Sequence, residues 1–198
     1  LAAPRSLYPY SPKVHYAGLN GRDFGCLKQA GLPAEDLHLL PNPVHDPGEL
    51  PADARRQAVR AELLGEEAER QFVLYPTRAI RRKNLGELAF WAAVGGGETL
   101  FATSLTPKNP EAQPIHERWV QFVGEQGLPV RFGLGENSSG GFAEVMSAAD
   151  YTITTSVAEG FGMAFLEPWL YGKVLLGRNL PEVTGGFTGH GIRLDHLY

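Results

Sequence analysis

A run of cations follows a short apolar stretch that is typical of a buried strand. It places four positive charges within six positions, directly before a predicted helix that Asn84 can cap: Arg78, Arg81, Arg82 and Lys83. A helix start already carries roughly half a positive charge and unpaired N–H groups. Four further cations at this position are therefore unfavourable unless a bound anion offsets the positive charge. The run indicates either a solvated basic turn or a phosphate clamp, in which Arg offers a two-pronged contact and Lys a point charge.

A second stretch, residues 156–168, combines glycines with carboxylates. Gly160 and Gly162 let a backbone come close to a ligand, and the first N–H groups of the helix predicted over residues 162–171 have no helical partner. Glu167 lies in that predicted helix among apolar neighbours, where a carboxylate is expensive to bury alone. It therefore reaches solvent, pairs with an Arg or a backbone group, or accepts hydrogen bonds from ligand hydroxyls such as those of a ribose.

Other candidate residues give weaker signals. The glycine-rich residues 133–141 lack the dinucleotide fingerprint and the Walker lysine, although they could close over a ligand's base. The six histidines show no metal-ligand spacing, and no Gly-x-Ser-x-Gly surrounds Ser156. Cys26 is interpreted as a packed residue rather than a nucleophile. We therefore expect no metal and no resident cofactor.

These residues lie on an alternating pattern of strands and helices. Apolar runs predict strands at residues 72–76, 99–103, 130–132, 151–155 and 174–176, with helices of about ten residues between them. This alternation predicts an α/β fold with a doubly wound, mostly parallel sheet and helices on both faces. Ligands bind such sheets outside the carboxyl ends of the strands, which selects the loops at residues 76–84, 133–141 and 156–162.

Composition narrows the class of protein. The chain has 198 residues, 43% of them hydrophobic, which suffices for one sizeable domain or two very small ones. A formal net charge of −4 argues against nucleic acid as a partner, and no run approaches the ~20 apolar residues of a membrane helix. A single cysteine excludes a disulfide-stapled fold and suits a reducing compartment such as the cytoplasm.

The two ends of the chain show less regular patterns. The first 45 residues are predicted to be rich in loops, with a helix near residues 22–30 and a short strand at residues 37–40. A further helix is expected at residues 52–64. Near the carboxyl end we expect a helix from Pro181 and a strand at residues 191–194.

The glutamates give the chain a family resemblance. Glu159 and Glu167 frame the sequence Glu-Gly-Phe-Gly-Met-Ala-Phe-Leu-Glu, which resembles the paired-glutamate signature of GT-B glycosyltransferases of family four. Arg78, followed five residues later by Lys83, looks like the phosphate-binding loop of that family. Residues 40–44 resemble its linker into the C-terminal domain. The match covers roughly residues 37–187, and the paired glutamates are its most specific part.

The resemblance implies an activity and roles for particular residues. It implies transfer of a sugar from a nucleotide-diphosphate donor, with retention of configuration and without a metal. Arg78 and Lys83 would hold the diphosphate and stabilise the charge that develops on the leaving group. Glu159 would contact the donor sugar, and Glu167 the ribose hydroxyls. Backbone N–H groups would complete the phosphate site at three residues, namely Phe161, Gly162 and Met163.

The resemblance also implies a domain organisation. The chain would be the Rossmann-like C-terminal half of a two-domain GT-B architecture. Residues 1–45 would be the end of the N-terminal domain and the linker, and residues 46–198 the donor-binding domain, truncated at its C-terminus. The missing N-terminal domain would bind the acceptor, so this piece would be inactive alone.

Two alternatives remain open on the sequence. One is a nucleotide-sugar epimerase of the same architecture, which would place carboxylates and a His near the sugar. The other is a non-catalytic nucleotide-binding domain, which would keep the sheet without needing all four charged positions, Arg78, Lys83, Glu159 and Glu167.

Overall fold

The computed structural model describes residues 7–9, 11 and 13–198. The chain forms two compact units. The larger unit comprises His45–Ala158, Ala164–Arg178 and His196–Tyr198. The smaller unit comprises Leu1–Val44, Glu159–Met163 and Asn179–Asp195.

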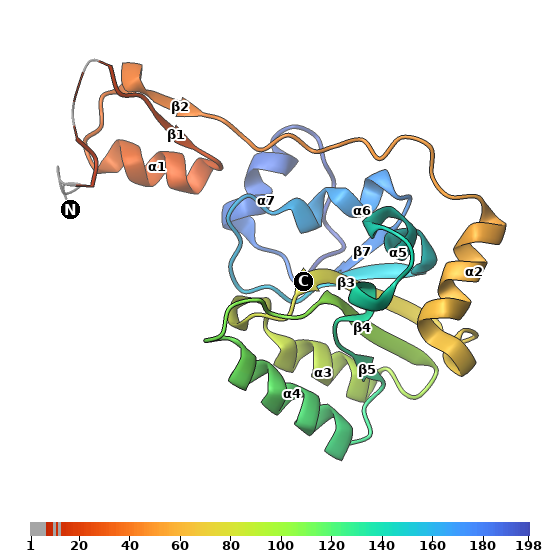
Figure 1. Cartoon of the computed structure of the whole chain (residues 1–198). Helices are drawn as coiled ribbons and strands as arrows, with labels where there is room; N and C mark the ends of the chain where they lie inside the picture. Colours follow the sequence, from red (N-terminus) through yellow and green to blue (C-terminus); the bar gives the residue numbers. More distant parts are fainter. Residues whose placement is uncertain (1–6, 10, 12) are drawn as a thin grey trace. The chain divides into compact units, whose positions relative to one another are not determined.

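A five-stranded parallel sheet forms the centre of the larger unit (Figure 1). Its strand order is β5-β4-β3-β6-β7, and every neighbouring pair is parallel. The strands are β3 (Gln71–Arg78), β4 (Thr99–Leu105), β5 (Val130–Arg131), β6 (Tyr151–Thr154) and β7 (Val174–Gly177). The predicted α/β class and parallel sheet are confirmed, and each strand lies within three residues of its predicted bounds.

Helices cover both faces of this sheet, which confirms the doubly wound arrangement (Figure 1). On one face, α2 (Asp53–Leu64) and α5 (Phe142–Ala148) pack on Phe72 and Leu74. On the other face, α3 (Leu85–Val94) and α4 (Gln113–Glu125) pack on Val73 and Tyr75. Alternate residues of β3 thus serve opposite cores, as the period of two along a strand requires. Because both of its faces are buried, β3 is apolar almost throughout.

The connection from β6 to β7 departs from the prediction of one helix over residues 162–171. The chain forms a 3₁₀ turn at Met163–Phe165 and then a short helix, α6 (Glu167–Leu170). Pro168 explains the break, because its missing N–H and its restriction on the preceding residue favour the first turn of a helix over its interior. Glu167 therefore begins a helix instead of lying inside one.

Gly177 ends β7 in a conformation that only glycine adopts easily. Its φ is 106°, and a Cβ built there would lie 2.1 Å from the carbonyl oxygen of Thr154. That oxygen accepts a hydrogen bond from the Arg178 N–H at 2.8 Å. Strands β6 and β7 therefore approach closely at their carboxyl ends.

The smaller unit is more regular than the sequence predicted for its first 45 residues. Strands β1 (Tyr16–Gly18) and β2 (Leu37–Leu39) pair in parallel, with α1 (Gly21–Gln29) between them. Helix α7 (Pro181–Thr188) packs on α1. The β1 strand was not predicted, because three residues are too few to show an alternating pattern. The strand expected at residues 191–194 is wrong, since these residues form a turn and an irregular segment.

Among the described residues, no helix combines the length and the apolar character needed to cross a membrane.

Candidate functional site

The strand order creates a topological switch point beside β3. The chain leaves β3 for β4 on one side, and β6 later pairs with β3 on the other side. In an open α/β sheet, ligands bind in the crevice outside the carboxyl ends of the strands at such a point. The loops after β3 and β6 therefore border the candidate site.

The loop after β3 carries the cations and turns sharply; we call residues 77–84 the basic loop. Arg78 is the exposed last residue of β3, and Arg81–Lys83 form one turn of 3₁₀ helix. Asn84 then adopts the left-handed conformation, with φ at 51°, and no other non-glycine residue in the described part of the chain has a positive φ. Asn84 occupies the predicted cap position of α3, but its side chain makes no capping bond and donates to Glu87 Oε2 at 2.7 Å.

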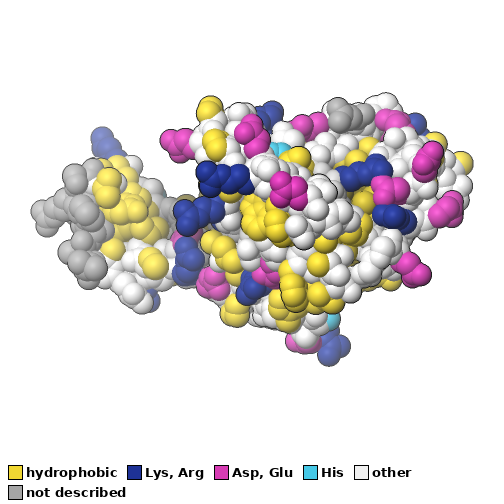
Figure 2. Space-filling model, turned by 90° about the horizontal axis from the view of Figure 1, so that it is seen from below, with side chains coloured by type: hydrophobic (Ala, Val, Ile, Leu, Met, Phe, Trp, Pro, Cys, Tyr) yellow, Lys and Arg dark blue, Asp and Glu magenta, His cyan; other side chains and the backbone are white. Residues whose placement is uncertain are grey.

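Lys83 differs from its basic neighbours because it is buried. Only 8% of it is exposed, and its Nζ lies 6.0 Å from the centroid of the Tyr75 ring. Arg81 and Arg82 are exposed. Figure 2 shows one face of the molecule, where dark blue Lys and Arg side chains are interspersed with magenta Asp and Glu side chains. These cations stand at the positive end of α3, and Glu87 in its first turn offsets only part of that charge. The basic loop therefore has the charge needed to attract an anion.

Hydrogen bonds join the basic loop to the loop after β6. The Val157 N–H donates to the Arg82 carbonyl at 2.9 Å, and the Arg82 guanidinium donates to the Ala158 carbonyl at 3.3 Å. Thr155 Oγ1 donates to the Lys83 carbonyl at 2.8 Å. Residues 155–158, the first part of the loop after β6, thus lie beside the basic loop at one edge of the sheet. The sequence analysis missed Thr155, although a polar residue at the end of a buried strand was a usable signal.

A network around Glu87 fixes the first turn of α3. Its Oε2 accepts from Arg178 Nη2 at 2.5 Å, and its Oε1 accepts from the Tyr198 hydroxyl at 2.5 Å. The Tyr198 hydroxyl in turn accepts from Trp91 Nε1 at 2.7 Å. Burial first, and then the bond to Glu87, raise the pKa of Tyr198 to about 12. The sequence did not reveal this network, because its members are up to 111 residues apart.

Glu167 begins α6 in the larger unit and is half-buried. Burial raises the pKa of its carboxyl group above the ordinary value. Neither Arg pairing nor backbone bonding of the carboxylate is present among the described residues, so no hydrogen bond offsets that burial. This is the expensive arrangement that the sequence analysis considered, and ligand hydroxyls would relieve it.

Between β6 and α6, the residues Glu159–Met163 belong to the smaller unit. Phe161 is buried and packs edge-to-face on Phe187 with ring centroids 5.5 Å apart. The Gly160 carbonyl accepts from Asn20 Nδ2 at 2.5 Å, and Gly162 has a φ of 91°. The structure therefore divides the predicted site residues: Arg78, Lys83 and Glu167 lie in the larger unit, and Glu159, Phe161, Gly162 and Met163 in the smaller.

The glycine-rich loop at residues 133–141 is anchored at the same edge of the sheet. The Glu136 carboxylate accepts from the Thr106 N–H at 2.9 Å and from its hydroxyl at 2.8 Å. These two bonds hold the pKa of Glu136 below its ordinary value. Gly133 has a φ of 69°, and a Cβ there would lie 2.6 Å from Thr106 Cγ2. The loop is thus fixed at its base against the end of β4.

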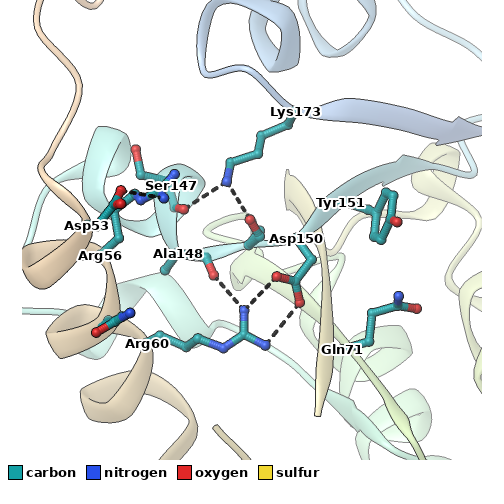
Figure 3. Close-up of a pocket in the computed structure, with 11 residues that line it drawn as sticks. Asp53, Arg56, Arg60, Gln71, Ser147, Ala148, Asp150, Tyr151 and Lys173 are labelled. Atoms are coloured by element: carbon teal, nitrogen blue, oxygen red, sulfur yellow. Dashed lines mark hydrogen bonds and ion pairs between the residues drawn. The ribbon is translucent and has the colours of Figure 1, made fainter. Parts of the chain in front are cut away.

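A cavity of about 560 Å³ opens at the opposite, amino edge of the sheet (Figure 3). Arg60 binds Asp150 through both of its oxygens, at 2.9 and 3.0 Å, and donates to the Ala148 carbonyl. Lys173 Nζ donates to the carbonyls of Ser147 and Ala149 at 2.8 and 2.5 Å (Figure 3). These cations are engaged with backbone and carboxylate oxygens of the protein. We place the candidate site at the carboxyl edge, because the topological switch point and the basic loop lie there.

The described part of the chain contains no group of three or more His, Cys, Asp or Glu residues arranged to hold a metal.

Comparisons with known proteins show which proteins this chain resembles in sequence and in structure. No family model matches the chain. The mannosylglucosyl-3-phosphoglycerate synthase of Petrotoga mobilis is 29% identical over 185 residues, which are 90% of this chain and 36% of that protein. The HepE protein of Anabaena, solved in complex with UDP-glucose, superposes with a TM-score of 0.73 at 19% identity. WaaG, a glycosyltransferase involved in lipopolysaccharide biosynthesis, superposes with a TM-score of 0.65 at 17% identity.

Coverage shows how much of each of those proteins the chain matches. The HepE match covers 93% of this chain and 49% of HepE, and the WaaG match covers 88% and 47%. The chain thus spans about half the length of these solved structures and about a third of the curated relative. Its fold is that of one Rossmann-like half of a GT-B glycosyltransferase. The resemblance drawn from the paired glutamates and the basic loop is confirmed at this level.

Proposed function

We propose that this chain is the donor-binding half of a glycosyltransferase that moves a sugar from a nucleotide-diphosphate donor to an acceptor. One observation carries the proposal: the basic loop brings four cations to the N-terminal side of α3, beside the switch point. Hydrogen bonds at Arg82 and Lys83 join this loop to the first residues after β6. The dipole of α3 and these side chains favour the same ligand, an anion with several oxygens. The names of the similar proteins, a synthase of a glycosylated compound and a protein crystallised with UDP-glucose, support a sugar nucleotide as that ligand.

The roles that we propose follow the family resemblance residue by residue. Arg78 and Lys83 hold the diphosphate and stabilise its charge as the glycosidic bond breaks, so no metal is required. Glu167 accepts hydrogen bonds from the ribose hydroxyls. Its burial without a hydrogen-bond partner for the carboxylate within the described part of the chain supports this role. Glu159 contacts the donor sugar. Three backbone N–H groups complete the phosphate site, at Phe161, Gly162 and Met163.

The rest of the proposal concerns the whole protein. Residues 1–45 belong to the end of an N-terminal domain and a linker, and residues 46–198 to the donor-binding domain. The acceptor binds a separate N-terminal domain, transfer retains the configuration of the sugar, and this half does not turn over alone. We propose the cytoplasm as the compartment, on the strength of the single free cysteine, Cys26.

Nucleotide titrations and two substitutions test this function. Calorimetry with UDP, GDP and ADP should detect binding of at least one nucleotide. Arg78→Ala should weaken that binding by about 10- to 100-fold, because it removes a charge-assisted hydrogen bond. Glu159→Ala in the full-length protein should abolish transfer while free nucleotide still binds, because Glu159 contacts the sugar.

The control is Arg118→Ala, which removes an exposed arginine from α4 and should leave binding and transfer unchanged. Folded protein that binds none of the three nucleotides contradicts the proposal. Full transfer by Glu159→Ala contradicts the role proposed for Glu159. A full-length protein that binds nucleotide but transfers no sugar favours a non-catalytic nucleotide-binding domain.

A further inference from the structure

The backbone at the end of the basic loop is strained and needs a partner to hold it. Asn84 is left-handed with φ at 51°, a conformation that costs free energy for any residue with a Cβ. Thr155 Oγ1 lies 2.8 Å from the Lys83 carbonyl oxygen and 3.2 Å from that of Asn84. Thr155 is completely buried, so water cannot replace its hydroxyl at these two oxygens. The hydroxyl therefore selects the turn in which both carbonyls face β6.

The same short segment supports the ammonium group of Lys83. Its Nζ lies over the Tyr75 ring, and the Tyr75 hydroxyl is hydrogen-bonded to Ser156 Oγ at 2.6 Å. Thr155 thus fixes the backbone of Lys83, and Ser156 fixes the Tyr75 ring that lies against the Lys83 ammonium group. Because the Lys83 side chain is buried, it has little freedom to compensate for a change in its backbone.

We propose that Thr155 is a positioning residue that places the Lys83 ammonium group for donor binding. This inference rests on the proposed function, in which Lys83 holds the diphosphate. Thr155 itself touches no substrate and acts through the turn at Lys83 and Asn84. A displacement of about 1 Å in a charged contact weakens binding and catalysis strongly, so the hydroxyl matters beyond its own hydrogen bonds.

Two threonines of one strand segment give a matched pair of variants. Thr152 on β6 is also completely buried, and its Oγ1 donates to the Val174 carbonyl at 3.2 Å, away from the basic loop. Thr155→Val and Thr152→Val each remove one buried hydroxyl and keep the shape of the side chain. Both should lower the Tm by a similar few degrees. Thr155→Ser keeps the hydroxyl and serves as the rescue.

Nucleotide affinity then separates positioning from stability. In the full-length protein, calorimetry with UDP, GDP and ADP should show Thr155→Val raising the Kd of the bound nucleotide by about tenfold. Thr152→Val and Thr155→Ser should stay within about twofold of the parent. In a Lys83→Met background, Thr155→Val should add less than about twofold, because its effect passes through Lys83. Equal Kd values for Thr155→Val and Thr152→Val overturn the proposal.

A readout without nucleotide keeps this inference separate from the proposed function. Limiting acetic anhydride, followed by mass spectrometry, measures how readily the Lys83 amine is acetylated. Thr155→Val should raise that rate severalfold over Thr152→Val, and equal rates overturn the positioning role. If no nucleotide binds the parent protein, the proposed function fails and acetylation alone decides the role of Thr155. Should Thr155→Val not fold, Thr155→Cys, a weaker donor, should give about a threefold effect on both readouts.

Discussion

The two edges of the central sheet both gather basic side chains, and they use them differently. At the amino edge, Arg60 and Lys173 donate to carbonyl oxygens of the last turn of α5 and the residue that follows it. Cations are stabilising there, because the C-terminus of a helix is its negative end. At the carboxyl edge, the cations of the basic loop precede the N-terminus of α3, where the same charge is opposed. The direction of the neighbouring helix therefore distinguishes the cations that stabilise the fold at the amino edge from the cations that favour an anion at the carboxyl edge.

This difference also shows why cavity size is a poor guide to the site. The cavity of about 560 Å³ lies at the amino edge, where the protein itself supplies the oxygens that its cations bind (Figure 3). The basic loop borders a smaller hollow of about 260 Å³, lined by Arg81 and Asn84 among others. The position of a charge relative to a helix end is therefore a better guide to the functional site than the volume of the neighbouring cavity.

Removing Arg60 should give the largest effect, and on stability alone. Arg60→Ala removes the arginine from Asp150 and from the carbonyls of Ala68, Arg70 and Ala148. Asp150 Oδ2 keeps its bond from the Phe72 N–H at 2.7 Å. We expect the free energy of unfolding to fall by about 2–4 kcal/mol in urea denaturation. The Kd for nucleotide should stay within about twofold. The control Arg56→Ala breaks an exposed pair with Asp53 and should cost less than about 1 kcal/mol.

A pair of lysine variants tests the two edges against each other. Lys83→Met should raise the Kd for nucleotide by about 10- to 100-fold, because a charge-assisted contact is lost. Lys173→Met should leave that Kd unchanged and lower the free energy of unfolding by about 1–2 kcal/mol, since two carbonyls lose their donor. The reverse pattern in calorimetry and urea denaturation would show that the functional edge is the amino one.

Glu167→Gln should give the smallest and most specific effect. Burial raises the pKa of Glu167 in the folded protein, so its ionisation at higher pH destabilises the fold. The variant should be more stable than the parent at pH 7 by about 0.5 kcal/mol or less, and this gain should vanish below about pH 4, where the carboxyl group is protonated in both states.

Nucleotide binding should change in the opposite direction. Glu167→Gln should weaken binding at pH 7, because the proposed ribose contact loses its charge. Glu111→Gln, at an exposed position, is the control for removing a carboxylate. A variant that is less stable than the parent at pH 7 would show that Glu167 has a stabilising partner in the folded protein.

The sequence predicted the regular part of the fold because periodic signals were long there. The strand β3 and the helix after Asn84 span eight and ten residues in the structure, and the predicted ranges, 72–76 and 85–94, match them closely. The strand β1 and the split before α6 escaped because each depends on only three or four residues. Short elements are stabilised by tertiary contacts, which local pattern does not encode.

The candidate site was predicted unevenly for a related reason. The type and spacing of charged residues such as Arg78 and Glu167 can be read directly from the sequence, so the sequence indicated these residues. Thr155 holds the end of the basic loop and Glu87 fixes the first turn of α3, through bonds to partners 72 and 91 residues away. A single sequence records no such pairing, and only the folded arrangement reveals it.

The tight approach at Gly177 has a consequence for mutational surveys of this protein. No other amino acid fits beside the Thr154 carbonyl without separating β6 from β7, so nearly every replacement at position 177 should abolish folded product. A screen scored by sugar transfer would rank this glycine with the donor-binding side chains. Soluble yield, measured in parallel, would distinguish an architectural requirement from a chemical one.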